Sequence, residues 1–330
     1  MKTIAQFNNI LHSFRINANC VNIREIDNYV YYDLKLNGNS KVKDIQRYSD
    51  EISLVLKKHG RPSIRLLRDQ GLVRLEFAVP RTSPLQLFNL LDNYDLPKGG
   101  LITLLGQTVD GKKIWMDLAQ NPHMIVAGTT GSGKSTLLHN IIANMLNYND
   151  CIMHLVDPKN VEFHQYASKI KRNISVSYTY DEAMFVLDSV ISTMEERYQE
   201  MRAGTPATNF PYVLLMIDEF ADLIAQDKDE VFFTRLCRLA QKCRAARISI
   251  ILSTQRPSVN IINGAIKANF PARIACRVAS HVDSKVVLDA TGAENLLGKG
   301  DALLRDNFHY MERFQVAYTD ATEVCKYFGE

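Results

Sequence analysis

The sequence predicts an α/β fold whose larger domain has a mostly parallel central sheet and is preceded by a small α+β domain. Two observations support this prediction. A glycine-rich loop separates an apolar, strand-like segment at 124–127 from a helical segment at 136–146. After that helix, apolar runs at 152–156, 213–217 and 248–252 alternate with helical patterns. Such continuous apolar runs are typical of parallel strands covered on both faces, so we expect helices on either side of the sheet.

The small domain is predicted over residues 1–97. Its strand-like segments are NYVYYDLKL (28–36), SIRLLR (63–68) and LVRLEFAV (72–79), and VKDIQRYSDEISLVLKKHG (42–60) has helical spacing. Pro97 and the two glycines that follow Lys98 predict a turn, which places the domain boundary near residue 97.

The large domain is predicted over residues 98–330 as alternating strands and helices. Beyond the glycine-rich loop, the predicted strands are 151–157, 212–220, 248–255 and 272–278, and the predicted helices are 181–202 and 230–246.

The glycine-rich loop has the pattern of a phosphate-binding loop. Gly128, Gly131, Gly133, Lys134 and Ser135 fill G-x-x-x-x-G-K-[ST] without a mismatch, between a strand and a helix as the motif requires. We expect loop amides to surround phosphates, Lys134 to reach the β and γ phosphates, and the Ser135 hydroxyl to bind Mg²⁺. The alternative is a chance glycine-rich turn. The predicted ligands are ATP and Mg²⁺, with nucleotide-binding residues Gly128, Thr129, Thr130, Gly131, Ser132, Gly133, Lys134, Ser135 and Thr136.

A pair of acids ends the strand VLLMID. We expect this strand to lie next to the phosphate loop, with Asp218 in the Mg²⁺ shell and Glu219 polarising the attacking water. The alternative reading places both acids at a helix N-terminus, where negative charge is favourable. At the end of the following strand, Gln255 is a candidate for sensing the γ-phosphate, although a plain turn residue is the alternative.

Composition limits the other possibilities. A net charge of +3 over 330 residues permits a local nucleic-acid surface without requiring one. Six cysteines without C-x-x-C spacing and an absence of long apolar runs predict a reduced, cytoplasmic protein without a metal cage. Cations are frequent between 238 and 285, and three uses stay open for each of them: a trans-acting arginine, a DNA contact or a solvated surface.

Taken in order, the motifs resemble the FtsK/SpoIIIE DNA translocases within the HerA-FtsK group of P-loop ATPases. The resemblance covers residues 105–305 through the segments GTTGSGKS, HLVDPKNVEFHQY, LLMIDEFADLI, RAARISIILSTQRPSVNIINGAIKANFPARIACRV and DSKVVLDATGAENLLGKGDAL. It implies a RecA-like motor, and the first hundred residues resemble the family's small α domain.

The resemblance further implies a homo-oligomeric ring, usually a hexamer, with ATP between subunits and double-stranded DNA through the centre. It places Lys134 and Glu219 in catalysis, Gln255 in the sensor segment and Arg273 as the trans arginine finger, because PARIA resembles the family's P-T-R-I-A segment. The DNA-facing candidates in pore loops are Arg202, Arg256 and Lys267.

The chain departs from chromosome-segregating members of that family. It carries neither their membrane helices and long linker nor their winged-helix domain, so we expect an unanchored motor that does not read bases. Two further functions stay open on the sequence: a secretion or conjugation coupling ATPase that moves protein or nucleoprotein, and a viral genome-packaging motor.

Overall fold

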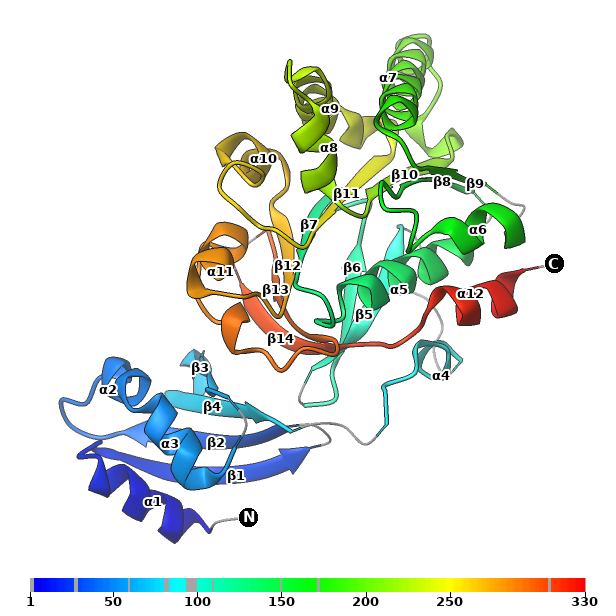
Figure 1. Ribbon diagram of the computed structural model, residues 1–330. Coiled ribbons are helices and arrows are strands. Elements are labelled where there is room, and N and C mark those ends of the chain that lie inside the picture. The colour runs from blue at the N-terminus through cyan, green and yellow to red at the C-terminus, as the bar shows by residue number, and fades with distance from the viewer. Residues whose placement is uncertain are drawn as a thin grey trace. The chain divides into compact units, whose positions relative to one another are not determined.

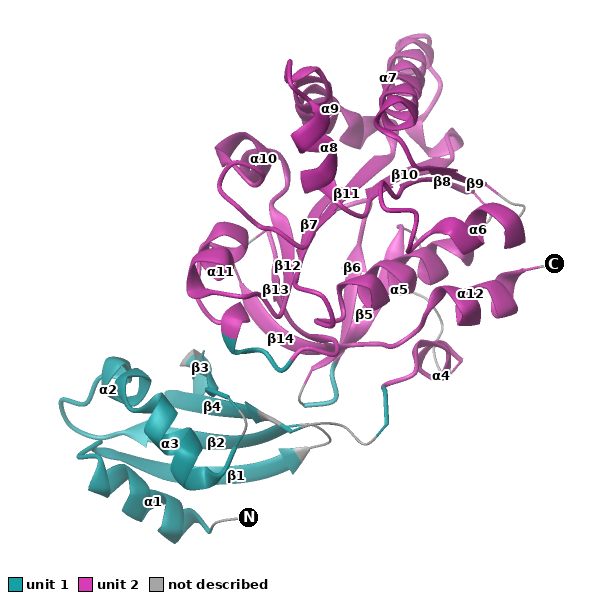
Figure 2. Ribbon diagram, in the orientation of Figure 1, with its two compact units in different colours: residues 1–84, 109–112, 295–297 teal, residues 85–108, 113–294, 298–330 magenta. Residues whose placement is uncertain are grey.

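The computed structural model describes residues 3–26, 29–58, 60–79, 83–92, 100–108, 110–148, 150–170, 173–307 and 310–329. They form two compact units, shown in teal and magenta in Figure 2. Unit 1 comprises residues 1–84, 109–112 and 295–297, and unit 2 comprises the rest. The domain boundary predicted near residue 97 lies outside the described residues.

Unit 1 is an antiparallel sheet with the strand order β1-β2-β4-β3 and helices packed against it. Its core is mostly aliphatic and contains three aromatic rings in contact: the Phe7 and Tyr32 rings stack with centroids 4.3 Å apart, and Phe77 meets Tyr32 edge-on. The segment 42–60, which has helical spacing, forms two short helices, and Lys57 ends the second in the left-handed region. The elements are α1 (Ile4–Ser13), β1 (Ala18–Ile26), β2 (Tyr29–Leu36), α2 (Val42–Arg47), α3 (Ser49–Leu56), β3 (Ser63–Leu67), the 3₁₀-helix η1 (Arg68–Gln70) and β4 (Leu72–Ala78).

Unit 2 is built on a ten-stranded sheet with the order β6-β5-β14-β13-β12-β7-β11-β10-β8-β9 (Figure 1). The strands from β12 to β9 are parallel, as predicted. The strands from β6 to β13 extend the sheet with antiparallel pairs, which the sequence analysis did not predict. The first half of the elements is α4 (Leu87–Leu91), β5 (Ile102–Thr108), β6 (Lys113–Asp117), β7 (His123–Ala127), α5 (Lys134–Leu146), β8 (Cys151–Val156), α6 (His164–Lys169), β9 (Ile174–Ser177), α7 (Tyr180–Arg202) and η2 (Ala207–Asn209). The second half is β10 (Tyr212–Ile217), α8 (Phe220–Gln226), α9 (Val231–Lys242), η3 (Cys243–Ala246), β11 (Ile248–Thr254), α10 (Gly264–Asn269), β12 (Ala272–Cys276), α11 (His281–Leu288), η4 (Ala293–Asn295), β13 (Asp301–Arg305), β14 (Met311–Val316) and α12 (Ala321–Phe328).

The order of the parallel strands corrects one prediction. β11 pairs with both β7 and β10, so the strand that carries Asp218 is not next to the strand that leads into the phosphate loop. The order of segments along the chain does not fix their order in a parallel sheet, because a crossover can pass over a strand that is added later. β11, the strand in between, therefore places its side chains between the phosphate loop and the two acids.

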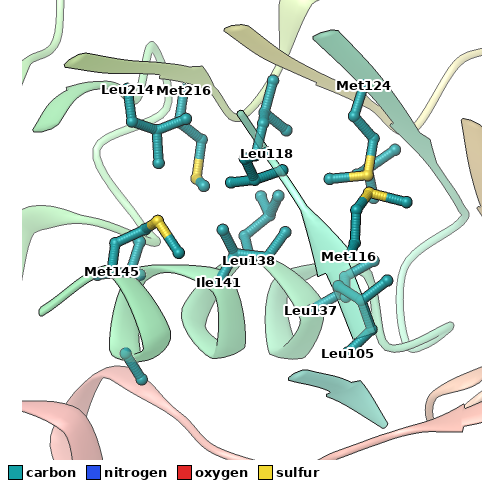
Figure 3. Packing of buried hydrophobic residues seen from close by; sticks show 14 of the residues in the cluster. Leu105, Met116, Leu118, Met124, Leu137, Leu138, Ile141, Met145, Leu214 and Met216 are labelled. Carbon is teal, nitrogen blue, oxygen red and sulfur yellow. The ribbon is translucent and has the colours of Figure 1, made fainter. Parts of the chain in front are cut away.

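Helix α5 covers one face of this sheet through an apolar stripe. Leu137, Leu138 and Ile141 are fully buried against residues of the strands, among them Met124 and Met216 (Figure 3). These residues recur at helical spacing, so one side of α5 packs on the sheet. The packing fixes the helix N-terminus at the end of β7, where the predicted phosphate loop lies.

Two whole-chain features complete the fold. All six cysteines, Cys20, Cys151, Cys237, Cys243, Cys276 and Cys325, are free and buried. Within the described ranges, none of the helices combines the length and the apolar character that crossing a bilayer requires.

Candidate nucleotide-binding site

The predicted phosphate loop connects β7 to α5 and is anchored to both neighbouring strands. Gly128 donates its amide to the Thr254 carbonyl at the end of β11 (3.2 Å), and Thr129 donates to the Arg277 carbonyl after β12 (2.9 Å). Gly131 and Gly133 have φ values of 74° and 102°, which glycine adopts without the strain of other residues. The loop thus ends at the N-terminus of α5, whose first amides have no acceptor inside the helix and suit an anion.

A second segment, residues 298–300, is bonded to the loop through backbone hydrogen bonds. The amides of Lys299 and Gly300 donate to the carbonyls of Gly131 (3.1 Å) and Ser132 (2.8 Å). Since the carbonyl and the amide of a trans peptide unit point in opposite directions, the amide of Gly133 points away from this segment. A Cβ at Gly133 would lie 2.3 Å from the Gly300 nitrogen, so the two backbones touch.

Lys134 and Asp218 meet in the buried part of the site. Lys134 Nζ donates to Asp218 Oδ1 (2.5 Å) and to Ser253 Oγ (2.9 Å), and both charged side chains are almost fully buried. Burial raises the pKa of Asp218 above its ordinary value, whereas the Lys134 ammonium acts to lower it. The two predicted residues therefore form a buried ion pair, with Ser253 on the strand between them.

Ser135, the predicted Mg²⁺ ligand, makes a hydrogen bond that the sequence analysis did not foresee. Its Oγ donates to Glu162 Oε1 (2.5 Å), and Glu162 Oε2 lies 3.3 Å from His139 Nε2. The hydrogen bond with His139 and the one from Ser135 hold the pKa of Glu162 at about 2, against the effect of burial.

Glu219 lies at the end of β10 with its carboxylate in a fixed environment. Thr254 Oγ1 donates to Oε1 (2.6 Å), the Gln255 amide lies 3.2 Å from both oxygens, and Lys159 Nζ donates to Oε2 (3.0 Å). The side chain is 1% exposed. The Gln255 side chain in turn accepts from Thr130 Oγ1 of the phosphate loop (3.3 Å), so the sensor candidate links the loop and the acid.

The donors at this place suit Mg²⁺. Ser135, Asp218, Glu162 and Asp157 supply oxygen atoms, which this hard cation prefers, and Asp157 Oδ1 is buried without a hydrogen-bond partner in the described part of the chain. No three acidic, histidine or cysteine side chains within the described ranges converge to hold a metal by themselves.

The remaining predicted residues are distributed over unit 2. Thr136 lies in the first turn of α5 and is half-buried. Arg202 at the end of α7 and Arg256 after β11 are exposed, and Lys267 of α10 contacts Asp289 (2.7 Å).

Arg273, the predicted trans arginine, is buried. Its guanidinium donates to Asp289 (2.6 Å) and to the carbonyls of Phe270, Val287 and Lys267 (3.2–3.3 Å). In this structure Arg273 makes these hydrogen bonds within its own chain. Of the cations in the same region, Arg244 and Arg256 are exposed.

The sequence analysis missed Lys159, Glu162 and Ser253 as parts of this site. Lys159 and Glu162 belong to HLVDPKNVEFHQY, which was recognised as a motif without a role for its residues. The available signal was position: charged residues directly after a buried parallel strand lie at the same sheet edge as the other site residues.

Comparison with known sequences gives a consistent result. A sequence model of the FtsK/SpoIIIE family matches residues 92–206 and 203–259, together just over half of the chain. A protein named DNA translocase FtsK from Chlamydia muridarum is 33% identical over 92% of this chain, and DNA translocase SftA from Bacillus subtilis is 32% identical over 90%. The chain spans 42% and 33% of the lengths of these relatives.

Solved structures share the fold. The conjugation coupling protein TcpA of pCW3, determined with ATPγS, superposes with a TM-score of 0.67 and 22% identity, covering 97% of this chain and 96% of its own. The cytoplasmic domain of the type VII secretion ATPase EccC from Thermomonospora curvata gives 0.61 at 22% identity, covering 75% of this chain and 35% of its own.

Proposed function

Because the chain belongs to the FtsK/SpoIIIE family, we propose that it hydrolyses ATP and uses the energy to translocate double-stranded DNA. One observation carries this proposal. The phosphate loop, the Asp218–Glu219 pair and Gln255 come from β7, β10 and β11, and they meet at one edge of the sheet. The relatives named DNA translocase support DNA as the substrate.

Each residue has a proposed role that follows from its position. The loop from Gly128 to Gly133 and the first turn of α5 bind the phosphates through backbone amides. Lys134 exchanges its contact with Asp218 for the β and γ phosphates, and Ser135 with Asp218 holds Mg²⁺. When bound, Mg²⁺ neutralises phosphate charge as the bond to the γ-phosphoryl group breaks.

Glu219 is the proposed group that orients the attacking water. Its carboxylate is held in place by Thr254 and by the Gln255 amide, so little reorganisation is needed when the water binds. Gln255, which reaches Thr130 of the loop, is the proposed γ-phosphate sensor.

We also propose a homo-oligomeric ring, a hexamer as is usual for the family, with ATP between subunits and duplex DNA in the centre. Arg202, Arg256 and Lys267 are the proposed DNA contacts, and Arg273 stays the sequence-based candidate for the trans arginine. Contacts of this kind reach the phosphate backbone, so binding should weaken steeply with salt and should not depend on base sequence. A cytoplasmic location is proposed with these roles, since all six thiols are free.

The test is the steady-state ATPase rate with and without long linear duplex DNA. We expect duplex DNA to raise the rate several-fold, single strands to have little effect, and Lys134→Ala and Glu219→Gln to be inactive. Lys228→Ala and Glu196→Gln, at exposed positions, are the matched controls and should behave as the wild type does. Full ATPase activity of Lys134→Ala would contradict the site assignment.

The same measurement separates the alternatives. A coupling or secretion ATPase that moves protein would hydrolyse ATP without responding to naked DNA. A genome-packaging motor would respond to DNA but would also copurify with a capsid partner.

A further inference from the structure

The loop between β8 and α6 contains a motif that the proposed function does not use. Asp157 at the end of β8 is fully buried, and its Oδ2 accepts the amides of Val161, Glu162 and Phe163, each at 2.9 Å. Three hydrogen bonds to one carboxylate oxygen hold this turn in a single conformation. The turn therefore presents the Glu162 side chain from a rigid position.

Glu162 is directed at the first turn of α5. Its Oε1 accepts a hydrogen bond from the Ser135 hydroxyl (2.5 Å), and its Oε2 contacts His139, one helical turn further on. His139 Nδ1 is in turn 2.9 Å from the Tyr166 hydroxyl of α6. His139 and Tyr166 are buried, so a packed chain of side chains fixes the orientation of the carboxylate.

A serine that binds a metal through its oxygen keeps its proton, which must point away from the cation to an acceptor. Of the other carboxylates at this place, Asp218 is proposed to hold Mg²⁺ itself. Asp157 makes no hydrogen bond with Ser135, because its Oδ1 has no partner in the described part of the chain and its Oδ2 accepts three backbone amides. Glu162 already accepts the hydrogen bond of the Ser135 hydroxyl in this structure. We propose that Glu162 is a positioning residue of the Mg²⁺ site: by accepting the Ser135 proton it turns the lone pairs of Ser135 Oγ toward the metal. This inference rests on the proposed nucleotide site and extends it.

The experiment measures metal affinity rather than turnover. Mn²⁺ binding to the complex with ATPγS is followed by electron paramagnetic resonance, and the affinity for a fluorescent ATP analogue is measured in EDTA. For Glu162→Leu, which has no hydrogen-bond acceptor, we expect Mn²⁺ affinity to fall about tenfold to a hundredfold, as is usual when the partner of a metal ligand is removed. Nucleotide affinity in EDTA should stay within about twofold, since the loop amides and Lys134 are unchanged.

A double-mutant cycle distinguishes positioning from a general structural effect. Since Glu162 acts through Ser135, Glu162→Leu should cause no further loss of Mn²⁺ affinity in a Ser135→Ala background. Glu162→Asp keeps the charge and should retain part of the affinity, and Glu196→Leu on α7 is the exposed control. Wild-type Mn²⁺ affinity in Glu162→Leu, or additive losses in the double variant, would overturn the inference. Failure of the wild-type protein to bind nucleotide in any condition would instead overturn the proposed function, and the inference with it.

Discussion

At the scale of single residues, Lys159 is the cationic partner of Glu219, and we can predict the effect of removing it. Its ammonium donates to the Glu219 carboxylate at 3.0 Å and lies 3.8 Å from Asp222. Lys159→Met removes that donor, so we expect the glutamate to orient water less well and kcat for ATP hydrolysis to fall about tenfold. KM for ATP should change little, because Lys159 is not among the phosphate-binding residues. Steady-state kinetics with Lys159→Arg as the conservative variant checks this; a raised KM at unchanged kcat would show that Lys159 binds nucleotide instead.

Arg273 is a second residue whose environment predicts the effect of its removal. Its buried guanidinium donates to Asp289 and to three backbone carbonyls. Arg273→Ala would remove this donor from the carbonyls, whereas Asp289 would keep its contacts with Lys267 and Arg305. We expect a loss of about 2–4 kcal/mol in the free energy of unfolding, against less than about 0.5 kcal/mol for exposed Arg256→Ala. Urea unfolding measures both.

Mixing subunits tests the trans role of Arg273 separately. If Arg273 acts across a subunit boundary, Arg273→Ala and Lys134→Ala proteins, each inactive alone, should regain ATPase activity when mixed. If its role lies within its own chain, mixing will restore nothing.

At the scale of elements, the support of the phosphate loop by residues 298–300 gives Gly133 a structural task besides phosphate binding. A side chain there would collide with the Gly300 backbone at 2.3 Å, and its φ of 102° is unfavourable for alanine. We expect Gly133→Ala to lose nucleotide binding and also to lower the melting temperature without nucleotide. Gly131→Ala is the comparison, since φ is positive there too but a Cβ meets nothing within 4 Å. Equal melting temperatures for the two variants would contradict the clash.

The elements also show what the sequence could predict. The central parallel strands were predicted because each is a continuous apolar run; β10, for example, is buried along almost its whole length. The antiparallel strands β5, β6, β13 and β14 were missed. β6 illustrates the reason. It is an edge strand that pairs with β5 alone, and its buried residues Ile114 and Met116 alternate with half-buried ones, so it has no continuous apolar run.

Within the site, motif residues were predictable because phosphate chemistry fixes their spacing. Contacts between segments were not. Glu162 contacts Ser135 across 27 positions of sequence, and Lys159 contacts Glu219 across 60. These contacts depend on the order of the strands in the sheet, which local sequence patterns do not specify. The buried state of Arg273 was equally hidden, because its partner Asp289 lies beyond the next helix.

At the scale of the whole molecule, the burial of His123 should make the stability of unit 2 depend on pH. It begins β7 and is 4% exposed, and burial lowers its pKa from 6.5 to about 4. Between these values the unfolded chain binds a proton that the folded chain does not, so stability is present above pH 6.5 and is lost as pH falls toward 4. We expect His123 to contribute a loss of about 2 kcal/mol between pH 7 and pH 5.

Trp115 in β6 is the single tryptophan of the chain and lies in unit 2, so its fluorescence reports the unfolding of that unit. In His123→Leu, urea unfolding followed by this signal should show a smaller decrease in stability over the same pH range. An identical decrease in the variant would assign the acid sensitivity to other groups.

The burial of all six cysteines has a practical consequence for measuring motion. Burial raises the pKa of the Cys151, Cys243 and Cys276 thiols to about 12, so hardly any reactive thiolate forms at neutral pH. The natural protein should therefore be inert to maleimide dyes while it is folded. A cysteine introduced for Phe185, 77% exposed on α7, would carry a single fluorophore without the removal of any native cysteine. Single-molecule fluorescence with the proposed DNA substrate can then use the otherwise unaltered chain.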